Sequence, residues 1–418
     1  MKILHLNTYK DNGGAGKAAG RLDSALRQQG IDSELWVNFS FSQNRNIKTF
    51  SSGIFRRGYT AVGIIMERMM ARLYLKPLKT PFSFPLLGTD ISNHPAVIEA
   101  DILHLHWLNH GFLPPAELVK LSKLNKPIVW TFHDSNAFTG GCHVRYSCDH
   151  FENECGNCPL LKNSNPNDWS HRIWKRKEKA YAGLNFEIVA PSKWMAASVG
   201  RSKLLHNRKI HVVPNTLNSE VFKPLPKAGA KKVFGIEEKK FVMLSGFMPS
   251  RNDLHKGTSY LLDALEAVLK QIPKDQIELL VFGNRDEKNL PSFPVKVTFL
   301  GRIDKEEKLA TCYSAADVFL APSLEDNLPY TVMESLACGT PVVAFTTGGI
   351  PDMVCHQVNG YLAEYCSSED FAAGISWVYN HPDKERLNIN ARNTVEERFS
   401  ETVVAAQYIE LYNLLLQK

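Results

Sequence analysis

Short apolar runs rich in Val, Ile, Leu and Phe alternate along the chain with longer segments of helical periodicity. The runs predict one series of strands at residues 2–7, 33–38, 101–107, 128–133, 186–192 and 209–215, and a second series at 240–246, 276–283, 297–301, 317–323 and 341–345. Strands that alternate with helices form right-handed βαβ crossovers, which place the strands parallel in one sheet. The pattern therefore predicts an α/β fold with two doubly wound, Rossmann-like domains whose strand ends face a shared cleft.

The stretch between the two series indicates a domain boundary. Pro214, Pro224 and Pro226 interrupt a polar, basic segment there, and prolines mark loops between regular elements. We therefore predict an N-terminal domain at 1–215 and a C-terminal domain at 216–395. From about Arg386 the pattern becomes helical, with apolar residues on one face, which predicts a terminal helix at 396–418.

Composition narrows the functional classes. The 418 residues are 44% apolar and 22% charged, and 49 basic against 43 acidic residues give a net charge of +6. This balance is too mild to indicate nucleic acid, but it is compatible with an acidic ligand or a membrane face. The start, MKILHLNTYK, does not resemble a signal peptide, and charges interrupt the longest apolar segment, 59–75. We expect a cytoplasmic chain whose eight cysteines are core residues or metal ligands.

Residues 317–349 carry the most informative pattern. An apolar strand leads into a loop, then a short helix bounded by Pro329 and Gly339, then a strand and a Gly-Gly turn. Asp326 in the loop and Glu334 in the helix can face one crevice at the carboxyl ends of the strands. Such a crevice suits a ligand with anionic and hydroxylated parts. Spacing alone leaves an ordinary strand–helix–strand unit with two solvated acids equally open.

Two further loops contain candidate phosphate-binding groups. Gly13 and Gly14 lie between the first strand and a helix, where glycine permits close backbone approach to an anion, although a plain tight turn fits equally well. Arg251 and Lys256 lie between a strand and a helix in the second domain and could neutralise a diphosphate. Considered alone they indicate a solvated pair. Together with the two carboxylates of 317–349 they favour a ligand site.

Histidines cluster in the predicted N-terminal sheet. His133 ends an apolar strand and is followed by Asp134, a position that faces the ligand edge of an α/β sheet. His104 and His106 alternate within the preceding strand, which favours packed core histidines over functional ones. His133 is therefore the functional candidate.

Four of the cysteines, Cys142, Cys148, Cys155 and Cys158, lie within seventeen residues with the spacing C-x5-C-x6-C-x2-C. A turn that holds two thiolates is half of a typical four-cysteine zinc site, and four protein ligands would make such a zinc structural. The longer first spacings leave a redox-labile thiol cluster as the alternative.

Residues 54–90 combine basic side chains with many apolar ones, including Arg56, Arg68, Arg72, Ile65 and Met69. A basic amphipathic segment can lie on an anionic membrane. A helix that faces the core and has a solvated basic rim is the simpler interpretation, so the membrane interpretation is retained only as one to test.

Taken together, these motifs resemble a retaining glycosyltransferase of glycosyltransferase family 4, which has the GT-B fold. EDNLPYTVMESLACGTPVVAFTTGGIPDMV resembles the E-x7-E region of the family, and Glu334 matches its second glutamate. Arg251 and Lys256 match the diphosphate-binding pair, TFHD places His133 on the active-site histidine, and VVPNTLN and RFSETVVAAQYIELYNLL match the interdomain and terminal segments. The stretch 130–161 further resembles a bacterial subset that makes exopolysaccharide, capsule or lipopolysaccharide glycans.

The resemblance implies roles for individual residues. The catalytic set would be His133, Asp326 and Glu334, and the donor-binding set would be Gly13, Gly14, Arg251, Lys256, Glu325, Asn327, Leu328, Pro329, Tyr330, Thr331, Val332 and Glu334. The chain departs from the pattern at the first glutamate, where Asp326 stands with Glu325 before it. The N-terminal domain would serve the acceptor and the C-terminal domain the nucleotide sugar, and the terminal helix would pack back towards the N-terminal domain.

The implied reaction is transfer of a sugar from a nucleotide donor to a glycan or lipid-linked acceptor, with retention and without a catalytic metal, in the cytoplasm or at the inner membrane. Two alternatives remain open. A GT-B nucleotide-sugar epimerase would turn over the donor alone. A non-catalytic binding protein would show no turnover, and if it bound nucleic acid its affinity would depend on salt.

Overall fold

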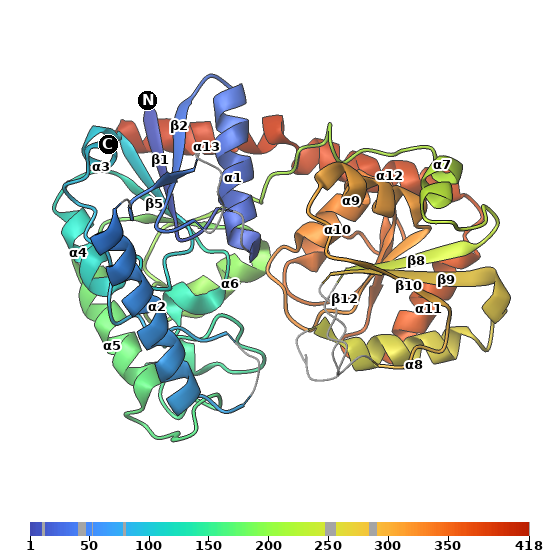
Figure 1. The fold of residues 1–418 in the computed structure, drawn as a ribbon, viewed down its shortest axis with the longest axis horizontal. Coiled ribbons are helices and arrows are strands. Elements are labelled where there is room, and N and C mark those ends of the chain that lie inside the picture. The colour runs from blue at the N-terminus through green and yellow to red at the C-terminus, as the bar shows by residue number, and fades with distance from the viewer. Residues whose placement is uncertain are drawn as a thin grey trace. The chain divides into compact units, whose positions relative to one another are not determined.

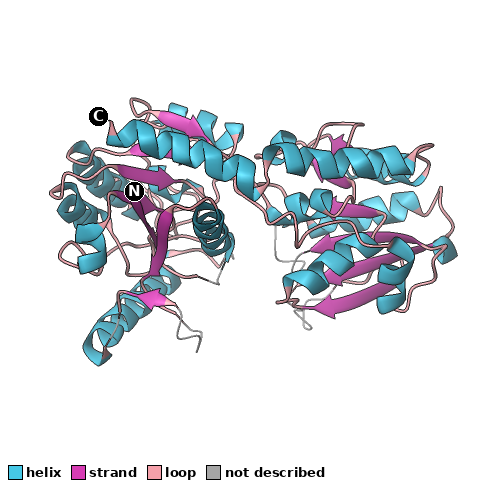
Figure 2. Ribbon diagram, turned by 90° about the horizontal axis from the view of Figure 1, so that it is seen from above, coloured by secondary structure: helices cyan, strands magenta, loops and turns pink. Residues whose placement is uncertain are grey.

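The computed structural model describes residues 1–10, 13–40, 47–51, 53–77, 81–246, 256–283 and 291–417. The chain divides into two compact units (Figure 1). Unit 1 comprises Met1–Thr216 and Val404–Lys418, and unit 2 comprises Leu217–Val403. In both units a parallel sheet lies between helices (Figure 2).

Unit 1 is built on a seven-stranded sheet of order β3-β2-β1-β4-β5-β6-β7, in which every pairing between strands is parallel. Its strands are β1 (Lys2–Asn7), β2 (Asp32–Val37), β3 (Lys48–Thr49), β4 (Ile102–Leu105), β5 (Ile128–Thr131), β6 (Glu187–Ala190) and β7 (Ile210–Val212). Its helices are α1 (Gly13–Gln28), α2 (Ile54–Tyr74), α3 (Pro95–Glu99), α4 (Pro115–Ser122), α5 (Trp169–Ala182), α6 (Lys193–Arg201) and most of α13 (Glu401–Leu416). The strand order reverses between β1 and β4, the position where doubly wound sheets bind ligands.

Unit 2 is built on a six-stranded parallel sheet of order β10-β9-β8-β11-β12-β13, and its order reverses between β8 and β11. The strands are β8 (Phe241–Gly246), β9 (Ile277–Phe282), β10 (Val297–Gly301), β11 (Val318–Ala321), β12 (Val342–Phe345) and β13 (Gly360–Ala363). The helices are α7 (Lys227–Val233), α8 (Thr258–Val268), α9 (Glu306–Ala315), α10 (Tyr330–Ala337), α11 (Ser368–Tyr379) and α12 (Lys384–Arg398).

Helix α13 completes the core of unit 1. Its buried residues Val404, Tyr408 and Tyr412 pack with Ile3 of β1 and Val129 of β5 in one apolar cluster. The central strands β4, β5 and β6 are buried on both faces, as expected for a parallel sheet covered by helices.

The predicted fold class is confirmed, since both sheets are parallel and doubly wound. All eleven predicted strands overlap observed ones, whereas β3 and β13 were not predicted. The predicted terminal helix is interrupted, because α12 ends at Arg398 and α13 begins at Glu401. The described helices include none that is long and apolar enough to span a bilayer.

Candidate active site

The predicted phosphate-binding loop of unit 2 follows β8 at the point where the strand order reverses. Its residues 247–255, including the predicted Arg251, lie outside the described part of the chain. Lys256 is described, and its Nζ lies 3.1 Å from Asp326 Oδ2 in the loop after β11. The two strand ends that flank the switch point therefore bring together a predicted phosphate-binding cation and a predicted sugar-binding carboxylate.

Glycines hold this loop against its neighbours. A Cβ on Gly348 would lie 1.8 Å from the carbonyl oxygen of Asp326, and a Cβ on Gly257 would lie 1.9 Å from that of Pro322. Gly349 N–H donates to the Asp326 carbonyl over 3.0 Å. Only glycine permits such close approach, so the Gly-Gly turn fixes the backbone from which the Asp326 side chain projects.

Helix α10 begins directly after this loop. Pro329 is its N-cap, one position before the predicted first turn, and Gly339 has φ 73 just past its end, as predicted. Neither Pro329 nor Gly257, the N-cap of α8, caps its helix with a side chain. The other predicted residues of the segment lie in the loop or in the first turn of α10: Glu325, Asn327, Leu328, Tyr330, Thr331 and Val332.

Glu334 is buried on α10. The residue is only 2% exposed, and its Oε2 accepts a hydrogen bond of 3.1 Å from the Tyr313 hydroxyl of α9. Burial raises the pKa of Tyr313 well above its ordinary value, and the charge of Glu334 adds to the effect. Tyr313 therefore remains a hydrogen-bond donor that orients the Glu334 carboxylate.

In unit 1, Gly13 and Gly14 begin α1 after β1. A Cβ on either would meet no atom within 4 Å, although Gly13 has φ 79. Gly16 is the tighter position, because a Cβ there would lie 2.5 Å from the Lys10 carbonyl oxygen. The spacing of glycines did not single out Gly16, whose small size is required for packing.

His133 lies two residues past the end of β5. Its Nε2 is 3.0 Å from His106 Nδ1, and His106 Nε2 is 3.0 Å from His5 Nδ1. Burial lowers the pKa of His133 to about 4 and that of His5 to about 3, and it holds the pKa of His106 well below its ordinary value. These rings are therefore neutral near pH 7. His104 and His106 are buried, as predicted, whereas His5 was not singled out by the sequence.

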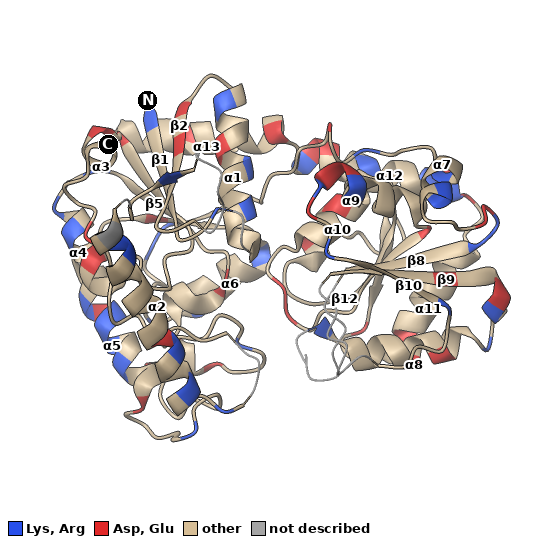
Figure 3. Ribbon diagram, in the orientation of Figure 1, with Lys and Arg blue, Asp and Glu red and all other residues tan. Residues whose placement is uncertain are grey.

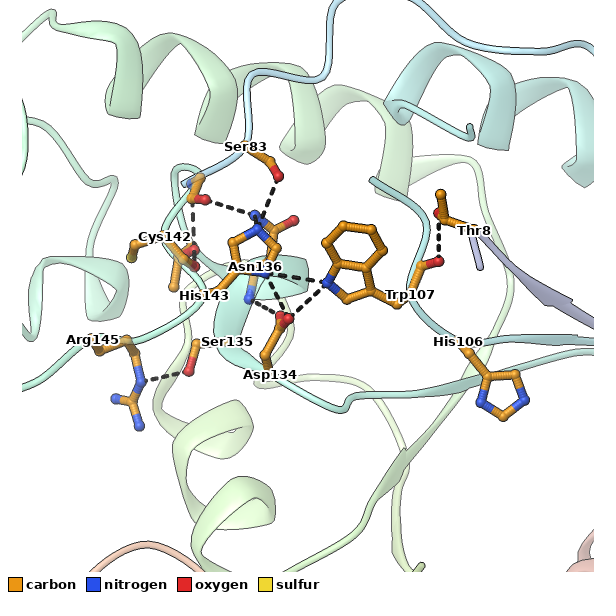
Figure 4. Close-up of polar contacts among 12 residues, drawn as sticks. Thr8, Ser83, His106, Trp107, Asp134, Ser135, Asn136, Cys142, His143 and Arg145 are labelled. Carbon is orange, nitrogen blue, oxygen red and sulfur yellow. Dashed lines mark hydrogen bonds and ion pairs between the residues drawn. The ribbon is translucent and has the colours of Figure 1, made fainter. Parts of the chain in front are cut away.

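A second polar cluster extends from Asp134. Although Asp134 is adjacent to His133 in the sequence, the two side chains belong to different hydrogen-bond networks. Asp134 Oδ2 lies 2.6 Å from His143 Nδ1 and accepts 2.9 Å from Trp107 Nε1, and His143 Nε2 lies 2.9 Å from Ser83 Oγ (Figure 4). His106 lies apart from this cluster in the same view. The Ser83 hydroxyl is buried, so this Ser–His–Asp arrangement is a hydrogen-bond network and not an accessible nucleophile.

Glu67 of α2 lies beside this cluster. Its Oε1 accepts 3.0 Å from the Phe84 N–H, whereas its Oε2 is buried and has no hydrogen-bond partner among the described residues. Burial raises the pKa of Glu67 to about 7, against opposing effects of Ser83 and His143. The carboxyl group therefore keeps its proton to a higher pH than an ordinary glutamate does.

A cavity in unit 1 opens beside His133 and Asp134. It is lined by apolar and polar groups that include His106, Trp107 and Lys177. Lys177 is buried and donates to the carbonyl oxygens of Asn136 and Thr139. Burial lowers its pKa to about 8, and the nearby Cys142, Cys155 and Asp134 act in the opposite sense.

The four clustered cysteines are free thiols on the loop after Asp134. Cys155 Sγ accepts 3.2 Å from Gly140 N–H, and the turn Cys155-Gly156-Asn157 has positive φ at all three residues. Burial raises the pKa of Cys142 to about 12 and that of Cys158 to about 11. Among the described residues, His5, His104 and His106 have donor atoms that all lie within 4.8 Å of one another, so this set could hold a metal ion. The four cysteines do not form such a set.

Two units, each with a parallel doubly wound sheet of this order, are typical of the class of GT-B proteins, and comparisons with known structures support that class. HepE of Anabaena, solved in complex with UDP, matches with a TM-score of 0.64 at 17% identity over 99% of this chain and 100% of that one. WaaG, a glycosyltransferase involved in lipopolysaccharide biosynthesis, matches with a TM-score of 0.62 at 14% identity over 98% and 99%. At these identities the likeness concerns the fold.

Sequence comparison identifies the family. The model of Glycosyltransferase Family 4 matches residues 12–221 and that of Glycosyl transferases group 1 matches residues 239–381. The chain belongs to glycosyltransferase family 4, a family of retaining glycosyltransferases, as the resemblance predicted.

Individual relatives match over different lengths. A D-inositol 3-phosphate glycosyltransferase of Segniliparus rotundus is 30% identical over 50% of this chain and 48% of its own length. WcaC of Escherichia coli K12, described as a colanic acid biosynthesis glycosyl transferase, is 25% identical over 82% and 83%. A phosphatidyl-myo-inositol mannosyltransferase of Mycobacterium leprae is 29% identical over 75% and 73%. The chain thus spans about half the length of the first of these relatives.

Proposed function

We propose that this protein transfers a sugar, with retention of anomeric configuration, from a nucleoside diphosphate sugar to a glycan or lipid-linked acceptor in the synthesis of a bacterial surface polysaccharide. The observation that carries the proposal is the pairing of Lys256 with Asp326 at the switch point of unit 2 in a chain of family 4. Related structures were solved in complex with UDP and with UDP-glucose, and other relatives are described as acting in colanic acid and lipopolysaccharide biosynthesis. These names support the donor class and the acceptor class.

The leaving group determines what the donor site must provide. Breaking the bond from sugar to phosphate develops positive charge on the sugar ring and negative charge on the departing diphosphate. Lys256, Arg251 and the uncapped N-termini of α8 and α10 would stabilise the diphosphate. The Lys256–Asp326 ion pair would open when the donor binds, because phosphate then takes the ammonium group and the Asp326 carboxylate becomes free to hold sugar hydroxyls.

Glu334 would accept hydrogen bonds from the ribose hydroxyls, and Glu325 is the alternative to Asp326 for the sugar. Tyr313 already donates to Glu334 Oε2, which keeps that carboxylate in one orientation before the donor arrives. The cost of ordering the side chain is therefore met during folding. His133 would lie by the reacting carbon, as the family resemblance implies.

The mechanism we propose is attack on the face from which the diphosphate leaves. No residue in the predicted set is evidently placed as a covalent nucleophile, so the departing phosphate oxygen would take the proton of the acceptor hydroxyl. Neither candidate loop carries an Asp-x-Asp arrangement, and the cationic side chains with the helix N-termini would provide the charge stabilisation that a metal supplies elsewhere.

A donor panel tests this function. Nucleoside diphosphate release should require both a nucleotide sugar and a lipid-linked or glycan acceptor, and the product should have the anomeric configuration of the donor by NMR. Turnover of the donor alone with epimerised product would identify an epimerase instead, and absence of turnover with every donor and acceptor pair would favour a binding protein.

We also propose that the four cysteines hold one structural zinc. Cys155 begins a positive-φ turn that leads to Cys158, a shape that fits a metal-binding knuckle, but the four sulfur atoms do not all lie within 4.8 Å of one another, so the loop would have to draw them together around the ion. A four-thiolate zinc site carries two net negative charges, which the adjacent buried Lys177 would partly neutralise. The raised thiol pKa values are those of the metal-free cluster, and zinc would displace the protons. The clamp would order the loop that begins at Asp134.

Helix α2 supports a proposed contact with the anionic face of the inner membrane. One side of it packs in unit 1 through Thr60, Gly63 and Glu67, whereas a separate stripe is exposed and apolar. The stripe comprises Phe55, Tyr59, Val62, Ile65, Met69 and Leu73, which are 47–91% exposed. Exposed arginines of the same helix flank the stripe (Figure 3). Apolar side chains rimmed by positive charge fit an anionic lipid surface.

Vesicle flotation tests this contact. The protein should float with phosphatidylglycerol vesicles at low salt and remain in solution with phosphatidylcholine, and I65S with M69S should abolish flotation. I389S removes a similarly exposed apolar residue from α12 and should have no effect. If all variants float equally, or if the parent protein does not float, α2 does not contact the membrane as proposed.

A further inference from the structure

The three hydrogen-bonded histidines of unit 1 form a continuous chain across neighbouring strands. His5 lies on β1, His106 lies just past β4 and His133 lies just past β5. The two links, each 3.0 Å, join His5 Nδ1 to His106 Nε2 and His106 Nδ1 to His133 Nε2. His104 stacks on His106 but is outside the chain, because its own nitrogens bond Tyr412 and Thr131 over 2.6 and 2.7 Å.

This bonding argues against metal ligation at the same rings. A metal ion requires the nitrogen lone pairs to converge on one point. Here His104 and His106 are stacked with ring centroids 4.3 Å apart, and both nitrogens of His104 are already engaged. The described arrangement uses the imidazoles as hydrogen-bonding groups.

A neutral imidazole carries one N–H and one lone pair, so the links are not independent. If His5 donates through Nδ1, His106 accepts at Nε2 and must carry its own proton at Nδ1. His106 then donates through Nδ1, and His133 accepts at Nε2. The reverse direction makes every ring the Nε2–H form. The chain therefore has two states, and the state of His133 reports the state of His5.

The far end of the chain distinguishes the two states. His5 Nε2 is buried and has no hydrogen-bond partner among the described residues. In the Nε2–H state this atom would be an unpaired buried donor, which is rarer in proteins than an unpaired acceptor. In the Nδ1–H state it is only an unused lone pair, and the buried donors of His5 and His106 are both paired.

We propose that His5 and His106 are positioning residues that hold His133 in its Nδ1–H form, with Nε2 occupied as an acceptor. Free histidine favours the opposite form, so the chain would impose a state that the side chain does not prefer alone. His133 would then present a fixed N–H donor, and not a general base, at Nδ1. This inference deepens the proposed function, and its catalytic consequence rests on the role proposed for His133.

Nitrogen NMR of the histidine-labelled full chain reads the tautomer directly, because protonated and bare imidazole nitrogens resonate far apart. His133 is assigned by the signal lost in H133Q. We expect Nδ1–H in the parent. H106L and H5L should shift His133 towards Nε2–H, whereas H5N, whose amide can still donate to His106 Nε2, should retain Nδ1–H.

H104N is the matched control, since His104 is equally buried beside the chain but not a member of it. It should leave the His133 tautomer unchanged. In the transfer assay we expect H5L to lower kcat about tenfold with KM for the donor within about twofold, and H5N to restore kcat, because His5 is two hydrogen bonds from His133.

Three results would overturn the inference: Nε2–H at His133 in the parent, an unchanged tautomer in both H5L and H106L, or a stoichiometric metal ion bound by these histidines in the purified protein. If H5L or H106L fails to fold, the His133 tautomer in the parent protein and in H5N still tests the inference. Full activity of H133Q with the expected tautomers would instead reject the proposed role of His133 and leave the chain itself intact.

Discussion

Each of the two sheets has one point at which the strand order reverses, and the residues that lie there differ in chemistry between the two units. In unit 2 the segments that follow the strands flanking the switch point bring charged residues together, with Lys256 and Asp326 paired at 3.1 Å. In unit 1 the corresponding strand ends meet at neutral imidazoles, buried so that their pKa values are lowered. The difference suggests that one unit provides charge for a diphosphate and the other provides oriented hydrogen bonds for hydroxyl groups.

The largest effect is expected from removing charge in unit 2. Lys256→Ala and Glu334→Ala should each lower transfer by ~10²-fold or more, because a preorganised electrostatic contact is lost. The measurement is steady-state diphosphate release, with folding checked by circular dichroism. Lys239→Ala removes an exposed lysine of the same unit as a control. Near-parental turnover in either site variant would refute the charged donor site.

Two single substitutions in unit 2 test which of two adjacent carboxylates holds the donor sugar. Asp326→Ala and Glu325→Ala remove adjacent carboxylates, of which Glu325 is the more buried. The variant with the larger loss of kcat/KM for the donor identifies the residue that fills the role of the first glutamate of the family. Equal, small losses would mean that neither carboxylate holds the sugar.

The cysteine loop tests whether unit 1 serves the acceptor. Elemental analysis should find about one zinc per chain, and Cys155→Ser with Cys158→Ser should lose it. Because the loop begins at Asp134, we expect a higher KM for the acceptor and an unchanged Kd for the donor. Cys355→Ser, at an exposed thiol, is the control. A zinc-free parent whose four thiols all react freely would exclude the clamp.

Glu67 tests the neutrality of the polar network in unit 1. Its pKa of about 7 lies above the ordinary 4.5, so the folded state binds the proton more tightly than the unfolded state. The contribution of Glu67 to the free energy of unfolding is thus fully present below about pH 4.5 and falls by roughly 3 kcal/mol as the pH rises through 7. Glu67→Gln should remove this fall in urea unfolding at pH 5 and pH 8, whereas the exposed Glu238→Gln should keep it. Parallel pH profiles for parent and Glu67→Gln would contradict the assignment.

The smallest effect is expected from chelation. Activity of the folded protein should persist in excess EDTA, since Lys256, Arg251 and the helix N-termini are proposed to stabilise the leaving group. Turnover that disappears in EDTA and returns with magnesium or manganese would place a metal in the donor site and weaken the contrast between the two units.

Much of the fold was predictable because hydrophobic periodicity is a local property. The strand runs, the helix bounded by Pro329 and Gly339, and the packed state of His104 and His106 all follow from local sequence. The order of strands in the sheet is not local. The link from His5 to His106 to His133 depends on β1, β4 and β5 being neighbours, which spacing along the chain does not reveal.

The same reason explains what was missed around the site. His143 meets Asp134 only because the loop between them folds back, and Gly16 is required only because the Lys10 carbonyl lies against it. A buried carboxylate on an amphipathic helix, Glu67, was visible in the sequence as a charge that interrupts an apolar run. Its placement beside Ser83 was not, since that contact depends on tertiary packing.

The return of α13 to unit 1 makes that unit discontinuous, and this has a consequence for the order of folding during synthesis. Unit 2 is one uninterrupted segment that can complete its own core as soon as it leaves the ribosome. Unit 1 is synthesised first, yet Tyr408 and Tyr412, which cover Thr131 and His104, follow only after unit 2. Part of one face of the nascent N-terminal sheet therefore stays uncovered until α13 is synthesised. The domain that is synthesised first is thus the last to complete its core.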